Sequence, residues 1–412
     1  MTQDQLPTYK LPEKIEAFRS QVIEFCNAHI RPRAMSVEDS AQYPDDLHAL
    51  FAKAGLLRAV VPDDCGGLGL GFLGRTVLIE EVARISGAVS MIPQVNELGC
   101  TPLAIAGTPE QRQLFAAPVA RGEMFASYGL TEANAGSDIG AMETRAVRDE
   151  KGDGKGGGSG WVISGSKAWI CNVRQPNGFC IVFARTSADG GSKGLTAFIV
   201  PTSSEGFRIL GAEPTMGLRG SPTYNLELND VRVSDAHRLG DVGSGFMLAM
   251  RTLDRTRAAV AAQALGIARA AFDAAVGYAV SRKTFGVAII EHQSIGFQIA
   301  DMDMKIRAAR HLVYEANTAL DAGASNVSHL SSIAKCYASD VAMEVASGAV
   351  DIFGGNGYSR RHPVERYMRD AKVTQLYEGT NQIQRLIISR HVKRAALGNL
   401  AKDAKVIHVP TD

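Results

Sequence analysis

The sequence has almost no excess of charge of either sign. Its 412 residues include 44 Lys or Arg and 43 Asp or Glu, a formal net charge of +1 at pH 7. No binding surface for nucleic acid is therefore predicted, and the basic residues near the C-terminus are interpreted as a solvated helix face. Hydrophobic residues make up 45% and charged residues 21%, which indicates a soluble globular protein of two or three domains.

Cysteine is scarce, and its spacing forms no metal motif. The six cysteines include no Cys-x-x-Cys pair and no histidine at the spacing of a zinc site, so no metal is expected. Reduced thiols and a cytoplasmic location are expected instead. The first residues, MTQDQLPTYKLPEK, show neither an apolar signal core nor an Arg- and Ser-rich leader, and no apolar run is expected to span a membrane.

One glycine pattern fits a dinucleotide-binding motif but lacks the setting of that motif. Gly69, Gly71 and Gly74 match G-x-G-x-x-G, yet no strand pattern precedes them and no acidic residue follows at the expected distance. The pattern is interpreted as a turn between helices.

The hydrophobic pattern changes twice, which predicts three domains. Helical periodicity runs through residues 1–125, short β-type runs separated by turn residues occupy 126–240, and long helical segments return in 241–412. The last region is predicted to hold four long helices in a bundle, because apolar residues recur at spacings of three and four. The predicted fold class is mostly α with a β domain, and the glycine-rich segment 151–160 is expected to be a hairpin tip.

Three glycine-containing or basic segments are candidates for binding a ligand. YGLTEANAGSD (128–138) exposes backbone N–H groups and the hydroxyls of Thr131 and Ser137, unless it is an ordinary Asn- and Gly-rich turn. RKTFG (282–286) fits a pyrophosphate site or a basic helix C-terminus. FGGNGY (353–358) allows close approach of a ligand to the backbone, or it is a glycine cap.

Two further segments carry chemically distinctive side chains. KAWICN (167–172) places Trp169 and Cys171 on the same face of a strand, where a tryptophan is commonly part of the core. QLYEGTNQIQR (375–385) contains a single carboxylate, Glu378, shortly before a helix start. It is either a solvated acid near the helix N-terminus or a base directed into a pocket.

In order and spacing, these motifs are similar to those of the acyl-CoA dehydrogenase family over nearly the whole chain. The segments that carry the resemblance are YGLTEANAGSD, KAWICN, RKTFG with the following EHQ, FGGNGY and RDAKVTQLYEGTNQIQR. The resemblance implies an N-terminal α-helical domain, a middle β-barrel-like domain and a C-terminal four-helix bundle. It also implies FAD bound without a Rossmann motif, and a homo-oligomer that is usually a tetramer.

The implied reaction is the oxidation of an acyl-CoA to the trans-2-enoyl-CoA, as in fatty acid β-oxidation. Glu378 matches the base that removes the α-proton while hydride passes from Cβ to flavin N5, with electrons continuing to an electron-transferring flavoprotein. Burial should raise the pKa of Glu378, and its backbone N–H is expected to stabilise the thioester oxygen together with a ribityl hydroxyl of FAD. Some relatives carry the base at the position of Thr256, which is not an acid here.

The resemblance also carries binding roles over by position. The positions matching FAD contacts, some of them across a subunit interface, are Tyr128, Leu130, Thr131, Gly136, Ser137, Trp169, Ile170, Cys171, Arg282, Thr284, Phe285, Gln293, Gly354, Gly355, Thr380 and Gln382. The positions matching substrate contacts are Ser137, Asp254, Arg257, Gln94, Val95, Tyr377 and Gly379. Because Gln94 and Val95 match the far end of the acyl site, short or branched acyl groups of about four to six carbons are expected.

Two residues depart from the family pattern. Cys171 stands where relatives commonly have threonine, and Asp351 lies near a position where many have glutamine, which makes it a poor partner for a pyrophosphate. The alternatives that remain at this point are a flavin-dependent oxidase on the same fold and a dehydrogenase that acts on an acyl-carrier protein.

Overall fold

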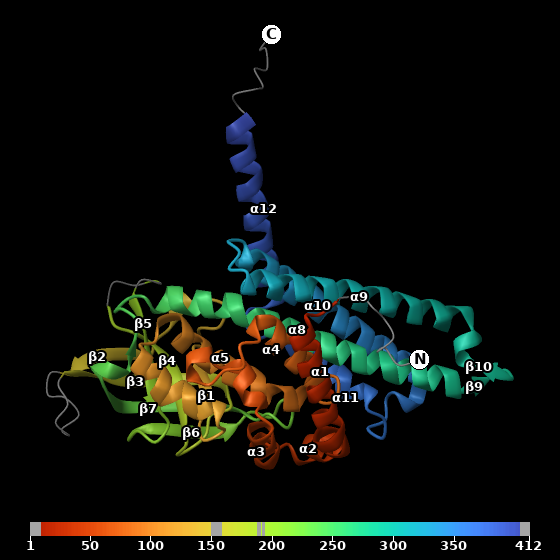
Figure 1. Ribbon diagram of the computed structural model, residues 1–412, viewed down its shortest axis with the longest axis horizontal. Helices are drawn as coiled ribbons and strands as arrows, with labels where there is room; N and C mark the ends of the chain where they lie inside the picture. Colours follow the sequence, from red (N-terminus) through yellow and green to blue (C-terminus); the bar gives the residue numbers. More distant parts are fainter. Residues whose placement is uncertain (1–9, 150–158, 188–190, 192–193, 404–412) are drawn as a thin grey trace, which may run out of the picture.

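The computed structural model describes residues 10–149, 159–187, 191 and 194–403, so most of the expected hairpin tip at 151–160 lies outside the described residues. Most strands lie at one end of the molecule, and long helices extend from them to the other end (Figure 1). The N-terminal helices cover one side of both parts. The predicted fold class, mostly α with a β domain between helical regions, is confirmed.

The N-terminal region is helical. Its helices are α1 (Glu13–Phe25), α2 (Ala34–Ser40), α3 (Asp45–Lys53), α4 (Gly71–Ala83), α5 (Gly87–Ala106), α6 (Pro109–Gln111) and α7 (Ala117–Ala120). The G-x-G-x-x-G segment is the turn into α4, as predicted. The N–H groups of Phe72 and Leu73 at the start of α4 donate to the carboxylate of Asp321, at 2.6 and 3.1 Å.

The middle region forms one sheet. Its strands are β1 (Phe125–Gly129), β2 (Arg145–Asp149), β3 (Gly160–Cys171), β4 (Gly178–Arg185), β5 (Leu195–Pro201), β6 (Phe207–Ala212), β7 (Thr223–Ser234) and β8 (Arg238–Leu239). They follow the order β6-β7-β3-β2-β4-β5-β8, and β1 pairs with β4 in parallel. β4, a nearly continuous apolar run, is the buried centre of this sheet.

A β-bulge near the end of β3 sets the position of two predicted site residues. The register with β7 shifts between Lys167 and Ile170, and Trp169 within this bulge has φ +63°. Trp169 is 58% exposed, so the interpretation of this tryptophan as a core residue is wrong. Ile170 is buried between the exposed Trp169 and the half-buried Cys171, as strand alternation predicts.

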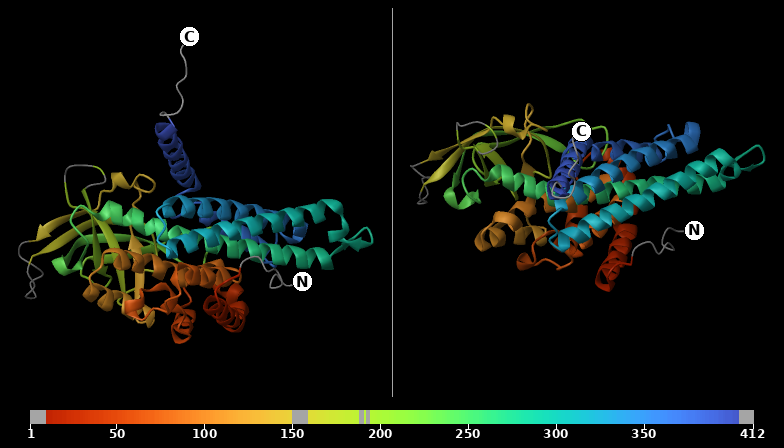
Figure 2. Two further views of the ribbon diagram at one scale, coloured as in Figure 1. Left: turned by 45° about the horizontal axis from the view of Figure 1, so that its top comes forward. Right: turned by 90° about the horizontal axis from the view of Figure 1, so that it is seen from above.

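The C-terminal region is helical again. Its elements are α8 (Gly245–Ser281), the short strands β9 (Lys283–Thr284) and β10 (Val287–Ala288), α9 (Gln293–Asp321), α10 (Val327–Phe353), α11 (Val364–Thr374) and α12 (Asn381–Asp403). Helices α8, α9 and α10 pack along one another, with α11 against α8 and α10. The fourth long helix, α12, touches α10 and then projects from the body, as Figure 1 and the left view of Figure 2 show.

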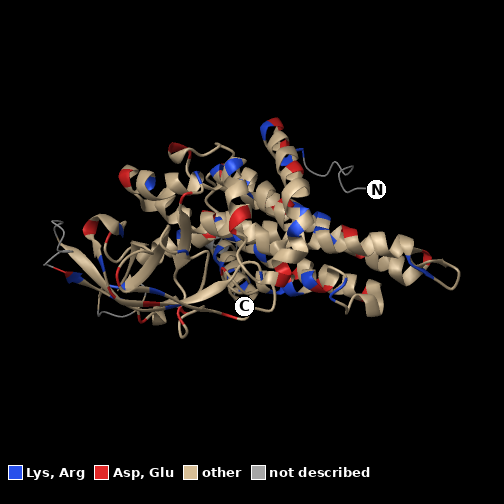
Figure 3. Cartoon of the chain, turned by 90° about the horizontal axis from the view of Figure 1, so that it is seen from below, with Lys and Arg blue, Asp and Glu red and all other residues tan. Residues whose placement is uncertain are grey.

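Helix α8 is the central helix of the molecule. By length and composition it could cross a membrane, contrary to the expectation that no run is apolar enough, but most of its apolar stretch is buried, as in the core helix of a soluble protein. A buried ion cluster joins it to α4: Arg269 donates to Glu80 and Glu81 at 2.7 and 2.8 Å. Charged residues of both signs are interspersed over the helices and strands (Figure 3).

Candidate active site

The loop between α11 and α12 carries Glu378 in a conformation that is unusual for this residue type. Glu378 has φ +52° and the following Gly379 has φ +91°. A non-glycine residue in this region costs of order 1–3 kcal/mol, so its surroundings must hold it there. The N–H of Ile383 donates to Thr380 Oγ1 at 3.3 Å, so Thr380 caps α12 and fixes the end of the loop.

The Glu378 carboxyl group points into the protein and is held by a residue of α8. Thr256 Oγ1 donates to Glu378 Oε2 at 2.6 Å, whereas the described chain provides no hydrogen bond to Oε1. Burial raises the pKa of Glu378 to about 7; the Thr256 hydrogen bond lowers it, the charge of Glu97 raises it, and the charges of Arg257 and Lys335 lower it. The interpretation of Glu378 as a solvated surface acid is therefore wrong, and a carboxylate of this pKa can accept a proton near neutral pH.

Two more groups of the predicted site lie beside Glu378. Its charge contributes to the raised pKa of Tyr128, which burial mainly causes, so β1 brings this tyrosine close to the carboxyl group. The backbone N–H of Glu378 donates to no group within the described ranges. A backbone N–H that has no partner among the described residues and lies beside a base can donate a hydrogen bond to a negatively charged oxygen of a ligand.

A network of polar side chains lies behind Tyr377, the neighbour of Glu378. The Tyr377 hydroxyl donates to Gln263 Oε1 and accepts from Gln94 Nε2 at 3.1 Å. Gln263 Nε2 in turn donates to Ser90 Oγ at 2.9 Å. Gln263 was not predicted as a site residue, although a glutamine within the apolar run VAAQALGIA of α8 is the kind of signal that could have indicated it.

An apolar cluster next to this network contains the second predicted acyl-site residue. Val95 packs with Ala88, Met91 and Leu218, and the cluster is contacted by Cys171, Val373 and Tyr377. The structure therefore brings Gln94, Val95, Tyr377 and Cys171 together at one place, from α5, β3 and the Glu378 loop.

Cys171 has a hydrogen-bonding partner within the protein. Its Sγ lies 3.1 Å from Thr223 Oγ1 on the neighbouring strand β7, where either atom can donate. Burial raises the pKa of the thiol, so it is protonated at neutral pH. The thiol of Cys171 and the hydroxyl of Thr223 each carry one proton, and their mutual hydrogen bond uses only one of the two. The other proton is available to a ligand.

Asp254 and Arg257 form a pair on α8, one turn apart. Arg257 Nη1 donates to Asp254 Oδ1, and Ser328 Oγ donates to the same oxygen at 2.9 Å. Arg257 is buried with its Nε lacking any partner among the described residues, while its charge lowers the pKa of Glu378. The pair thus lies next to the base, and its contact with a CoA group stays a prediction.

The remaining predicted cofactor residues lie at the opposite end of α8, around β9 and β10 (Figure 1). Phe285 is 97% exposed with φ +50°, and Thr284 Oγ1 lies 2.8 Å from His292 Nε2. Gly354 ends α10 with φ +57°, which confirms the glycine cap, and the neighbouring Asn356 donates to Tyr278 of α8 at 2.8 Å. Arg282, Gln293 and Gly355 belong to this second group of predicted cofactor residues. Within one chain, this group does not lie near Glu378.

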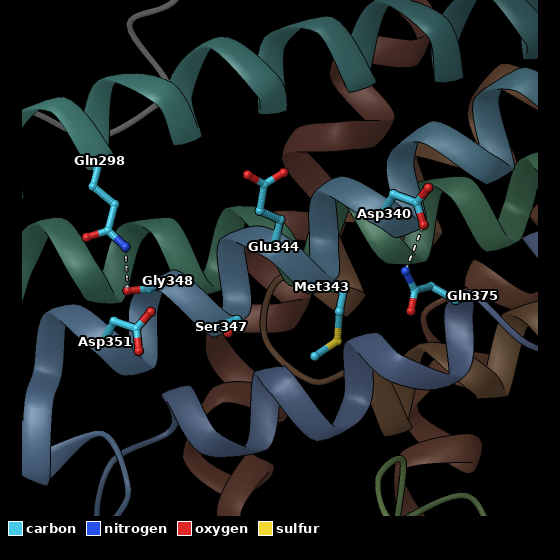
Figure 4. A pocket seen from close by; sticks show the side chains of 8 residues that line it. All are labelled: Gln298, Asp340, Met343, Glu344, Ser347, Gly348, Asp351 and Gln375. Carbon is cyan, nitrogen blue, oxygen red and sulfur yellow. Dashed lines mark hydrogen bonds between the residues drawn. The ribbon is translucent and has the colours of Figure 1, made fainter.

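Asp351 faces a groove on the outer side of α10 (Figure 4). The groove is also lined by Asp340, Glu344 and Gln298, and Gln298 Nε2 donates to Gly348 O at 3.4 Å. Its acidic lining makes it unsuitable for a phosphate. Among the residues with described positions, no group of His, Cys, Asp or Glu could hold a metal ion.

The predicted cofactor residues of β3 and of the loop that follows β1 fit an aromatic cofactor. Trp169 is largely exposed, and so are Gly136 and Ser137 in the loop that follows β1. This loop is joined to β3 next to Trp169, because the N–H of Ala168 donates to Thr131 O at 2.9 Å. An exposed indole beside a loop of small residues is a surface that a planar ring can cover.

Comparison with known proteins identifies the family. Models of the N-terminal, middle and C-terminal domains of acyl-CoA dehydrogenase match residues 12–123, 127–231 and 243–393. The chain belongs to the acyl-CoA dehydrogenase family. It is an oxidoreductase that acts on a CH–CH group of an acyl-CoA, and its cofactor is FAD.

Three relatives illustrate the similarity. "Probable acyl-CoA dehydrogenase FadE25" of Mycobacterium tuberculosis is 41% identical over 387 residues, which cover 94% of this chain and 97% of the relative. The structure of butyryl-CoA dehydrogenase from Megasphaera elsdenii has a TM-score of 0.88 and 37% identity, covering 93% of this chain and 99% of the other. A chain from a study of the electron transferring flavoprotein of Acidaminococcus fermentans has a TM-score of 0.89 and 39% identity, covering 94% and 99%.

Proposed function

We propose that this acyl-CoA dehydrogenase oxidises a short-chain acyl-CoA between Cα and Cβ, with Glu378 as the base. The observation that carries the proposal is the Glu378 carboxyl group itself. It is turned inward by a left-handed backbone, it is bonded to Thr256 at 2.6 Å, and its pKa is raised to about 7. A carboxyl group of this pKa is about half ionised at pH 7 and still basic enough to accept an α-proton.

In this proposal Glu378 Oε1, which has no internal donor in the described chain, takes the α-proton. The N–H of Glu378 donates to the thioester oxygen, on which negative charge develops as the proton leaves. When bound, FAD would supply the acceptor for the hydride of Cβ, so that removal of the α-proton and the β-hydride would take two electrons and two hydrogens from the substrate and leave a trans-2-enoyl-CoA. The proposed FAD contacts are those of Tyr128 to Ser137, Trp169 to Cys171, Thr380 and Gln382.

The substrate proposal rests on the surroundings of Tyr377. Val95, Met91 and Leu218 provide an apolar surface, whereas Gln94 and Gln263 place polar atoms at its edge. A longer chain would have to displace these side chains and break their hydrogen bonds, each of which contributes about 0.5–1.5 kcal/mol. We therefore propose acyl groups of about four to six carbons, each lost methylene contact being worth about 0.8 kcal/mol.

The partners are proposed on different grounds. The second group of predicted FAD contacts, from Arg282 to Gln293 and at Gly354 and Gly355, lies far from Glu378 in one chain, which supports an oligomer in which this group serves the FAD of another subunit. An electron-transferring flavoprotein is proposed as electron acceptor. This proposal is supported by the resemblance to the chain from the Acidaminococcus fermentans study. Six free cysteines support the proposed cytoplasmic location.

A panel of acyl-CoA thioesters added anaerobically tests the proposed function. We expect butyryl-CoA to bleach the bound FAD and to form an enoyl product in equal amount. An acyl-carrier-protein thioester bleaching FAD when butyryl-CoA does not would contradict the CoA assignment. Rapid reoxidation of the reduced enzyme by air, with no gain from an electron-transferring flavoprotein, would instead indicate an oxidase.

A further inference from the structure

A buried lysine contacts the turn that carries Glu378. Lys335 lies on α10 with its side chain fully buried, and its Nζ donates to Gly379 O at 2.8 Å and to Asn381 Oδ1 at 2.9 Å. Burying an ammonium group is unfavourable unless hydrogen bonds and negative charge compensate. Burial lowers the pKa of Lys335 to about 8, while the charge of Glu378 raises it.

Other residues fix the same loop to α10 and α12. Asn381 Nδ2 and Gln375 Nε2 both donate to Asp340 Oδ1 at 2.7 Å, so the two ends of the loop share one acceptor (Figure 4 shows the Gln375 bond). Gln384 Nε2 donates to Gly379 O at 2.9 Å. The carbonyl of Gly379 therefore accepts from two sides, and Lys335 is the charged one of its two donors.

We propose that Lys335 is a positioning residue for the base. By fixing the carbonyl of Gly379, it holds the left-handed turn that directs the Glu378 carboxyl group inward, and its positive charge favours the ionised form of that carboxyl group. This role rests on the proposed function of Glu378. The titratable and charged groups that face Lys335 are Glu378 in the loop, Arg257 on α8, and Cys336 and Asp340 on α10.

The nature of these neighbours makes Glu378 the group on which Lys335 acts. Asp340 is already bound by Asn381, Gln375 and Arg385, the last at 2.6 Å. Arg257 is positive and cannot compensate the lysine. Removing the lysine charge should therefore raise the pKa of the Glu378 carboxyl group, which that charge lowers.

The test uses the full-length, FAD-loaded enzyme and two neutral variants. Lys335→Met removes the charge and both hydrogen bonds, whereas Lys335→Gln removes the charge and keeps a donor. The rate of FAD reduction by butyryl-CoA is measured across the pH range that brackets the pKa of Glu378. Infrared difference spectra against Glu378→Gln follow the titration of the carboxyl group itself. Lys305→Met is the matched control, since Lys305 pairs with Glu344 at the surface.

We expect both Lys335 variants to raise the titration midpoint by about one pH unit, in the kinetics and in the infrared titration. Lys335→Met should lower the limiting rate about tenfold or more, and Lys335→Gln should recover part of it because its amide can still donate to Gly379 O. Lys305→Met should leave midpoint and rate unchanged.

A wild-type midpoint in Lys335→Met overturns the proposal. If Lys335→Met loses FAD or does not fold, the test uses Lys335→Gln, and a wild-type midpoint in Lys335→Gln overturns the proposal. Failure of every acyl-CoA to reduce the wild-type enzyme counts against the proposed function instead, and the infrared titration then still tests the link between Lys335 and Glu378.

Discussion

Replacing Thr256 by valine isolates the hydrogen bond that holds the proposed base. Thr256 Oγ1 donates to Glu378 Oε2 at 2.6 Å, and valine keeps the shape of threonine without the hydroxyl. A hydrogen bond to a charged group is worth about 1.5–3 kcal/mol. Since one pKa unit corresponds to about 1.36 kcal/mol, the loss should raise the pKa of Glu378 by about 1–2 units from its value of about 7.

The consequence is a rate that depends on pH in a defined way. At pH 7 the ionised fraction of Glu378 should fall from about one half to between about one tenth and one hundredth, so FAD reduction should slow about 5- to 50-fold. Above the new pKa the deficit should disappear. Stopped-flow reduction by butyryl-CoA measures this profile, and Thr256→Ser, which retains the hydroxyl, is the control. Superimposable profiles for Thr256→Val and wild type would show that this hydrogen bond does not set the pKa of Glu378.

Three further outcomes follow from the same site. In the wild-type enzyme the reduction rate should rise with pH around a midpoint near 7, because Glu378 must be ionised to accept a proton; a rate that falls over this range would contradict its role. Butyryl-CoA should give a higher kcat/KM than octanoyl-CoA, and the reverse order would show that Gln94 and Gln263 do not limit the acyl site. The flavin of Cys171→Thr should be reduced faster than that of Cys171→Ala, or should have a higher potential, by an amount that corresponds to about 0.5–1.5 kcal/mol. Equal behaviour of the two variants would show that this side chain has no part in the reaction.

Local pattern was sufficient to predict most of the elements. Short β-type runs and turn residues predicted strands within residues 126–240, where β3, β4, β5 and β7 lie, and apolar residues at spacings of three and four predicted the long helices of residues 241–412, because both signals depend on residues close in the chain. The short strands β2 and β6 were not predicted. The parallel pairing of β1 with β4 was not predictable either, since it joins residues about 50 positions apart.

The candidate site likewise contains residues that the sequence predicted and residues that it did not. Glu378 and its neighbours were predicted from a motif, and burial of Glu378 with a raised pKa agrees with that prediction. The residues that support it were missed, because Thr256, Gln263 and Lys335 reach the loop from helices that lie 122, 114 and 44 positions away. The left-handed backbone of Trp169 and Glu378 was also missed, since these residue types seldom adopt it and only tertiary contacts impose it.

Anaerobic reduction of Glu378→Gln compared with wild type shows whether Glu378 removes the α-proton. Glutamine keeps the size of glutamate and can still bond to Thr256, but it cannot accept a proton. We expect a protein that retains FAD, binds butyryl-CoA and reduces its flavin about 10²- to 10⁴-fold more slowly than wild type. A variant that binds FAD and substrate normally and keeps more than about 1% of the wild-type reduction rate would show that another group removes the α-proton.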